Sequence, residues 1–220
     1  MKGKIISIII AGAFTCGLGV TTAIAADEGF YAYAASGVSN TKRKSEIDTS
    51  LTNAGAVFTS TADEKGVAYK VQAGYQINPY LAVEGGYMDM GKHTYDAVAT
   101  VPLGATRQGS IKTTGWNLDA VGSFPVSEVF SIFARAGAVY YDLSSSCSGA
   151  VIACVNPNRN TKDTAFHYGA GVEWNVWDRW FVRAEYEVVS KVGEALNATG
   201  TTGTTKADVT MFTGGIGYRF

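Results

Sequence analysis

The sequence predicts an all-β protein, an eight-stranded antiparallel transmembrane β-barrel with up-and-down topology. Three observations predict this fold class. Apolar and polar residues alternate in eight segments, most regularly over residues 166–189. Short and long connections between these segments follow one another in strict rotation. The N-terminus carries the pattern of an export signal. An exported chain with alternating strands and no long apolar helix can still span a membrane, because closing a sheet satisfies every backbone polar group in lipid.

Residues 1–25 are predicted to be a signal peptide. Lys2 and Lys4 precede an apolar run over residues 5–20, and Ala23 and Ala25 are the small residues that a signal peptidase requires. The alternative is a retained membrane anchor, but the run is shorter than the roughly 20 residues of a spanning helix. We therefore expect residues 26–220 to form one domain, the barrel.

The sixth and seventh segments, residues 166–176 and 180–189, form a hairpin with one apolar and one polar face. Side chains on a strand alternate between its faces. Glu173 and Arg183 share the polar face, and Trp174 lies near the turn on the other. This pattern is typical of a hairpin with lipid outside, a polar lumen inside and its turn at a membrane interface.

The other six segments show the same alternation with less regularity. They are residues 30–38, 67–77, 81–90, 111–124, 129–143 and 209–220. In the first of them we expect Tyr31, Tyr33 and Ala35 to face outward. In the others the apolar parity is expected to face lipid and the polar parity to face the lumen.

The connections predict the topology. Tight turns are expected at residues 78–79, 125–127 and 177–179, and long loops at residues 39–66, 91–110, 144–162 and 191–206. The long segments are rich in Ser, Thr, Asn, Lys and Gly and lack helical periodicity. Outer-membrane barrels have short turns in the periplasm and long loops outside. An even number of strands then places both termini on the periplasmic side.

Seven charged residues fall on the inward parity. They are Lys70, Glu84, Asp119, Arg135, Glu173, Arg183 and Glu185. One interpretation is a gated pore whose ion pairs open and close. The other is a static network that fills a barrel too narrow for a column of water, and we favour this second interpretation.

Composition argues against several classes of function. The formal net charge is −1, so nothing indicates a nucleic-acid partner. The chain has two histidines, His93 and His167, and neither lies in a cluster typical of a metal site or of a lipid A-modifying enzyme. We therefore expect no enzyme activity and no cofactor. Cys147 and Cys154 lie in one predicted loop, where an oxidising compartment favours a disulfide over two reduced thiols.

The last strand ends with apolar residues at alternate positions, Ile216, Tyr218 and the terminal Phe220. This ending resembles the signal by which the barrel-assembly machinery recognises outer-membrane proteins. Together with residues 171–174 and 180–186, it is similar to the transmembrane domain of outer-membrane protein A and its small porin-like relatives. The resemblance covers nearly the whole mature chain and implies a monomer in the cell outer membrane. Outer-membrane protein A continues into a peptidoglycan-binding domain, whereas this sequence stops at Phe220, so we expect no peptidoglycan anchoring by that route.

The favoured function is a structural or adhesion-like surface role through four extracellular loops. A small-solute porin or gated channel is the alternative, and a lipid A-modifying enzyme is a distant third. The expected partners are outer-membrane lipid and lipopolysaccharide, the barrel-assembly machinery and host surface ligands. Basic residues in the predicted loops suit lipopolysaccharide phosphates, although such residues are also ordinary on solvated loops: Lys42, Arg43, Lys44, Arg107, Lys112 and Arg159.

Overall fold

The computed structural model consists of strands joined by turns and loops. It describes residues 28–41, 57–63, 65–101, 106–149, 158–193 and 207–220. The strands are β1 (Gly29–Thr41), β2 (Val57–Asp63), β3 (Lys65–Asn78), β4 (Leu81–Val101), β5 (Thr106–Pro125), β6 (Phe130–Gly149), β7 (Asn158–Trp177), β8 (Trp180–Val192) and β9 (Ala207–Arg219). No helix in the described part of the chain is long and apolar enough to cross a membrane.

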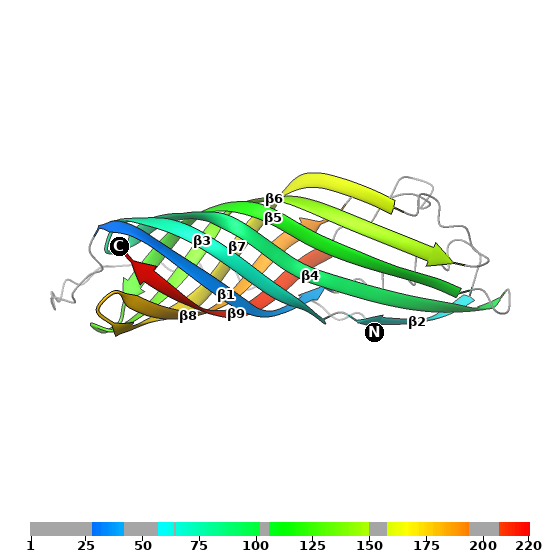
Figure 1. Ribbon diagram of the computed structural model, residues 1–220, viewed down its shortest axis with the longest axis horizontal. Coiled ribbons are helices and arrows are strands. Elements are labelled where there is room, and N and C mark those ends of the chain that lie inside the picture. The colour runs from blue at the N-terminus through cyan, green and yellow to red at the C-terminus, as the bar shows by residue number, and fades with distance from the viewer. Residues whose placement is uncertain (1–27, 42–56, 64, 102–105, 150–157, 194–206) are drawn as a thin grey trace, which may run out of the picture.

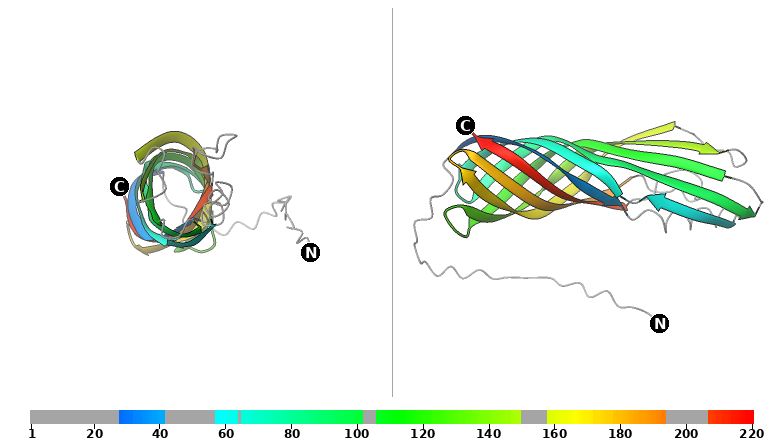
Figure 2. Two further views of the ribbon diagram at one scale, coloured as in Figure 1. Left: turned by 90° about the vertical axis from the view of Figure 1, so that its right-hand side faces the viewer. Right: turned by 60° about the horizontal axis from the view of Figure 1, so that its bottom comes forward.

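The strands form one closed antiparallel barrel. Around the ring the order is β4-β3-β1-β9-β8-β7-β6-β5, and the pairing of β5 with β4 closes it. Strands β2 and β3 both pair with β4, β3 along its first half and β2 along its second, so they share one position in the ring. The view down the axis in Figure 2 shows this closure. The predicted eight-stranded barrel is confirmed.

The barrel has two different ends. Its turn end carries the short connections after β3, β5 and β7, and the C-terminus also lies there (Figure 1). At the opposite end, the loop end, β4, β5, β6 and β7 extend beyond the 13-residue strands β1, β8 and β9. The predicted up-and-down order of the strands is therefore confirmed. The strict rotation of short and long connections is not, because residues 102–105 between β4 and β5 are as few as residues 126–129 between β5 and β6.

The predicted loops over residues 91–110 and 144–162 were too long. Strand β4 continues to Val101 and β5 begins at Thr106, so these strands pair far beyond the predicted ends. Strand β6 likewise continues to Gly149. In β5 and β6 both faces are polar here, as at residues 106–110 and 144–146, so there is no alternation to read although backbone pairing continues. In β4, Tyr95 and Ala97 still alternate with Thr94 and Asp96, but the strand first passes through the bulge between Asp89 and Lys92.

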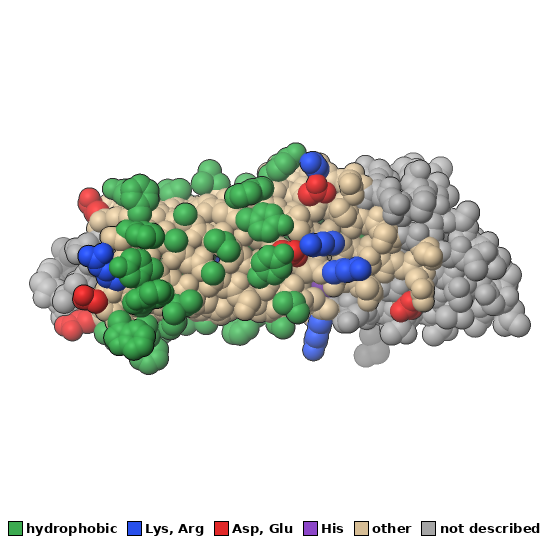
Figure 3. All heavy atoms as spheres, viewed as in Figure 1, with side chains coloured by type: hydrophobic (Ala, Val, Ile, Leu, Met, Phe, Trp, Pro, Cys, Tyr) green, Lys and Arg blue, Asp and Glu red, His purple; other side chains and the backbone are tan. Residues whose placement is uncertain are grey.

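The outward faces form an apolar band around the barrel, and Figure 3 shows this band on one face of the molecule. Large apolar side chains on it are exposed in every strand of the ring, for example Val71 at 60%, Leu118 at 65% and Ile216 at 50%. These residues have the predicted outward parity. In a membrane protein such exposure corresponds to contact with lipid.

The prediction that Tyr31, Tyr33 and Ala35 face outward was wrong. Both tyrosines are 3% exposed and Ala35 is 7% exposed, and all three lie inside the barrel. Phe30, at 66% exposure, is on the outward face of this strand. Both faces of β1 are apolar or aromatic in the sequence, so parity alone does not decide. The tyrosine hydroxyls find charged partners in the lumen, such as the carboxylate of Glu84.

Some predictions fall outside the described residues. The signal peptide over residues 1–25 is one, and so is the disulfide, because Cys154 and the side chain of Cys147 are not described. The backbone of Cys147 lies in β6, opposite Gly109 of β5. The signal peptide and the disulfide both stay predictions.

Candidate functional site: the filled lumen

The lumen contains three layers of buried side chains. The middle layer is ionic. On its turn side lies an aromatic cluster, formed by Tyr31, Tyr33, Phe133 and Phe181, and on its loop side lies an apolar plug. Each layer follows from the inward parity of the strands, because residues two apart on a strand point into the barrel at successive heights.

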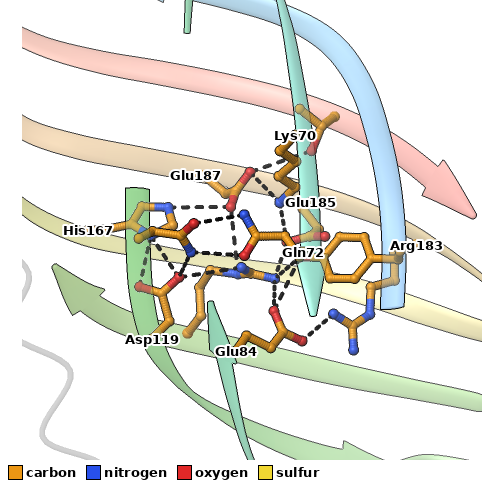
Figure 4. Close-up of polar contacts among 12 residues, drawn as sticks. Lys70, Gln72, Glu84, Asp119, His167, Arg183, Glu185 and Glu187 are labelled. Carbon is orange, nitrogen blue, oxygen red and sulfur yellow. Dashed lines mark hydrogen bonds and ion pairs between the residues drawn. The ribbon is translucent and has the colours of Figure 1, made fainter. Parts of the chain in front are cut away.

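Arg135 of β6 is the centre of the ionic layer, with a side chain that is fully buried. Its Nη2 atom lies 2.9 Å from Glu84 and 2.6 Å from Glu185. The same nitrogen donates a hydrogen bond of 2.7 Å to the hydroxyl of Tyr33. Asp119 lies 3.6 Å from Nη1. One guanidinium thus joins carboxylates from β4, β5 and β8 (Figure 4).

Lys70 and His167 extend this layer toward the loop end. The Nζ atom of Lys70 lies 2.9 Å from Glu185 and 2.7 Å from Glu187. The two ring nitrogens of His167 lie 2.9 Å from Asp119 and 3.3 Å from Glu187. Nδ1 is within hydrogen-bond distance of Asp119, whereas the contact of Nε2 with Glu187 lacks hydrogen-bond geometry and is an ion-pair contact of the imidazolium form.

Two amides complete the layer. The side chains of Gln72 on β3 and Asn117 on β5 donate to each other, at 2.8 and 3.0 Å. Strand β4 lies between these two strands in the sheet. Asn117 also donates to Asp119 at 2.6 Å. These contacts link the neutral and charged members into one hydrogen-bonded group, and buried polar groups of this kind need such partners.

Arg183 of β8 leads from the ionic layer into the aromatic cluster. It binds Glu84 and Glu173, each at 2.5 Å. Its guanidinium carbon lies 4.7–5.3 Å from the centres of four aromatic rings: Tyr31, Tyr33, Phe133 and Phe181. Contacts of this type attract a cation to the ring face. Nearer the turn end, Arg219 pairs with Glu173 and donates to Asn175 at 2.7 Å.

The charges of this lumen network come close to balance. Its five carboxylates are Glu84, Asp119, Glu173, Glu185 and Glu187, and its four permanent cations are Lys70, Arg135, Arg183 and Arg219. A protonated His167 supplies the fifth positive charge. Balance matters here because an unpaired charge in a low-dielectric interior costs several kcal/mol.

The apolar plug fills the lumen on the loop side of the network. It is formed by side chains of seven strands, none more than 8% exposed: Ala68, Met88, Met90, Ile111, Val139, Tyr141, Leu143, Ala165, Val189, Val192, Val209 and Met211. Buried apolar side chains pack as densely as an organic crystal. The plug therefore separates the charges from the loop end.

At the turn end the lumen opens into a cavity of about 670 Å³. Tyr31, Gln76 and Arg219 are among its lining residues, and so are the exposed Trp177 and Phe220. Water can reach the side of the aromatic cluster that faces the turn end through this cavity.

The seven charged residues singled out in the sequence all lie in the lumen, and ion pairs connect all of them. Sequence reasoning missed Glu187 as a member, although it has the same parity as Glu185. The sequence also did not indicate the carboxylate partners of His167. Arg219 was missed because its strand was read only for its outward residues, and Tyr31 and Tyr33 were assigned to the wrong face.

Known proteins of one family share this architecture. The model of the OmpA-like transmembrane domain matches residues 25–220. The chain belongs to the OmpA-like transmembrane domain family. Outer membrane protein A of Klebsiella pneumoniae is 32% identical over 149 residues, which are 67% of this chain and 39% of that protein. Its counterpart from Escherichia coli O157:H7 is 30% identical over 149 residues, 67% of this chain and 37% of that protein. The OmpA-like chain thus spans about two fifths of the length of these relatives.

Solved structures support the same fold for the OmpA-like barrel. Neisserial surface protein A covers 87% of this chain and 97% of its own, with a TM-score of 0.58 and 15% identity. Ail, the attachment invasion locus protein of Yersinia pestis, covers 88% of this chain and all of its own, with a TM-score of 0.51 and 17% identity. At these identities the likeness shows the fold alone. Membership of the family places the OmpA-like barrel in the outer membrane.

In the filled lumen of the OmpA-like barrel, the charged side chains pair with one another. Among the described residues, no group of three His, Cys, Asp or Glu side chains is placed to hold a metal ion. His93 is buried, and its Nε2 atom is 3.4 Å from the hydroxyl of Ser39. This distance is long for a hydrogen bond.

Proposed function

We propose that this OmpA-like barrel is a closed structural protein of a Gram-negative-type outer membrane, with an adhesion-like role at its loop end. The observation that carries the proposal is the filled lumen, in which the network centred on Arg135 is covered by the plug around Tyr141. Eight strands leave an interior just wide enough for side chains. A barrel without a water path acts through its surface and its loops.

In this proposal the loop end faces the surroundings and both termini face the periplasm. Short turns lie on the periplasmic side of known outer-membrane barrels and long loops on the outside. The long strands β4 to β7 carry paired, mostly polar segments well beyond the apolar band. These segments would hold the loops away from the membrane, where surface ligands of a host are accessible. The protein would act as a monomer, without catalysis and without a cofactor.

A gated diffusion channel is the second candidate. The observation in its favour is the cavity at the turn end, which reaches Arg219 and the aromatic cluster. Conduction would require the ion pairs of Arg135 to rearrange and the apolar plug to admit water. The seven charged residues predicted from the sequence would then be the gate, whereas in the favoured proposal they close the lumen permanently.

Two experiments test the favoured proposal. Epitope tags inserted after residue 103 and after Asp178 should be bound by antibody in intact cells for the first position only. Cells that display the barrel should then adhere to host-cell layers better than cells displaying a version with residues 102–105 and 150–157 replaced by short Gly-Ser linkers. Equal adhesion by the two strains, at equal surface levels, would contradict the adhesion-like role.

A further inference from the structure

Three lysines lie side by side on the outward face at the loop-side border of the apolar band. Lys65 is on β3, Lys92 on β4 and Lys112 on β5, and all three side chains are exposed. Gly66, next to Lys65, packs against Gly91, so the three strands bring the lysines to one part of the surface. We call these residues the lysine cluster. Figure 3 shows Lys and Arg side chains gathered along this border.

Aromatic residues on the turn side of the lysine cluster indicate its depth in the membrane. Tyr87 and Trp116 are in edge contact, with ring centres 5.5 Å apart, and Trp116 is 64% exposed. Exposed Trp and Tyr residues mark the interface between hydrocarbon and headgroups in membrane proteins. Lys112 lies four residues beyond Trp116 on β5, which puts the cluster at the level of the lipid headgroups.

A bulge in β4 turns Lys92 outward. The register between β4 and β5 shifts between Asp89 and Lys92, and Gly91 has a φ of 89°. Even-numbered residues of β4 face the lumen before the bulge, as Met88 does, whereas Lys92 is exposed after it. Bulges commonly redirect a side chain in this way. The amide of Gly91 donates to Asp89 at 2.9 Å and holds the bulge in place.

The bulge creates an unfavourable pair of like charges. Lys92 and Lys112 are direct partners in the register of β4 and β5. Like charges at such positions destabilise a sheet. Lys112 is compensated by Asp89, whose carboxylate is 3.0 Å away. In the described ranges no carboxylate lies within ion-pair distance of Lys92. By contrast, Lys162 of β7, which lies outside the cluster, has Asp142 at 3.5 Å.

We propose that the lysine cluster binds the phosphate groups of a phosphorylated lipid headgroup in the leaflet at the loop end. A phosphate between Lys92 and Lys112 would relieve their repulsion and neutralise a charge for which the described residues supply no carboxylate. Lysine is a common point-charge ligand of phosphate, and basic residues at this depth attract anionic headgroups. The placement in the outer leaflet rests on the proposed orientation of the barrel, but the binding chemistry does not.

The test uses the purified full chain in mixed micelles, so its outcome is independent of orientation in a membrane. Radiolabelled lipid A is titrated, and the lipid that stays with the barrel after gel filtration is counted. The variant Lys92→Gln/Lys112→Gln should bind lipid A about tenfold more weakly, the scale expected when surface lysines are lost. Lys162→Gln is the matched control and should bind like the wild type.

Two further arms sharpen the test. Asp89→Asn keeps the acceptor for Gly91 and removes the competing carboxylate, so it should bind lipid A more tightly than the wild type. Inorganic phosphate in large excess should not displace the lipid, which separates a headgroup site from a phosphate-ion site. A heat-dependent shift in gel mobility shows that each variant is folded. Equal binding by the folded double variant, or equal binding of dephosphorylated lipid A by the wild type, would overturn the proposal.

Discussion

Arg135 and Glu185 form an ion pair of 2.6 Å inside the barrel, although β6 and β8 are not neighbours in the sheet. Strand β7 lies between them, so no backbone hydrogen bond joins the two strands that carry the pair. The side chains of both residues are no more than 1% exposed. The lumen network therefore adds connections across the interior to those that the backbone makes around the ring.

Arg135→Ala should destabilise the folded barrel by about 3 kcal/mol, because the buried carboxylates of Glu84 and Glu185 each lose one of their two cationic partners. Urea unfolding in lipid vesicles, followed by tryptophan fluorescence, measures the change. Arg179→Ala removes an exposed arginine in the turn before β8 and should change the free energy of unfolding by less than about 0.5 kcal/mol. Similar values for the two variants would mean that the network does not hold the barrel together.

His167 and Glu187 should be energetically coupled. In a double-mutant cycle of His167→Leu and Glu187→Gln, the interaction energy should be about 1–2 kcal/mol, within the range for residues of one network. The reason is that Leu removes the imidazole that contacts both Asp119 and Glu187, whereas Gln removes one of these two negative charges. His167 and Glu173 lie six positions apart on the same strand, and their cycle should be additive. Additivity in both cycles would refute the coupling.

Gly137 should not tolerate a side chain. A Cβ atom there would lie 2.1 Å from the carbonyl oxygen of Leu118 and 2.3 Å from a carboxylate oxygen of Asp119. Gly137→Ala should therefore lower the free energy of unfolding by about 2 kcal/mol, the scale of overpacking. At Gly122 a Cβ atom meets nothing within 4 Å, so Gly122→Ala is the matched control. Equal unfolding midpoints for the two variants would contradict this steric account.

Phe220 should be needed for assembly into the outer membrane. Its ring is 73% exposed, next to Tyr218, and its amide donates to the carbonyl of Phe30 at 2.9 Å where the last strand closes on the first. Phe220→Asp should lower the surface level of the barrel while secretion continues, because the outward apolar row of the last strand is broken. Immunoblots of fractionated membranes and periplasm measure this. Wild-type surface levels of the variant would exclude a role in assembly.

Much of the fold could be predicted, since alternation is strong wherever a strand has lipid on one side. Prediction from alternation fails where the two faces of a strand have the same polarity. Beyond the apolar band, residues 106–110 of β5 are polar on both faces, so this part of its pairing with β4 left no periodic signal. In β1 both faces are apolar or aromatic. Which of them points into the lumen depends on the hydrogen-bond partner that Tyr31 finds there.

The lumen charges could be assigned to the interior by parity, but their partners could not. Partners depend on register and on which strands face each other across the barrel. Arg135 and Glu185 contact each other across the interior of the barrel, from two strands that are not neighbours. No local sequence pattern indicates such a contact. The apolar plug was missed for a different reason. Met90 and Leu143 share the inward parity of Glu84 and Arg135, but the lumen was expected to be polar, so apolar side chains at these positions were not recognised as filling it.

The lumen network and the apolar plug together make the central claim that the barrel is closed. Current through the purified protein in a planar lipid bilayer tests it most directly. The wild type should show little or no steady conductance, at most small flickering openings, since a charge network and a plug both exclude bulk water. Arg135→Ala should raise the open probability only slightly, because the plug around Tyr141 remains. Large, steady, voltage-independent currents from the wild type would contradict the claim and make the channel the leading hypothesis.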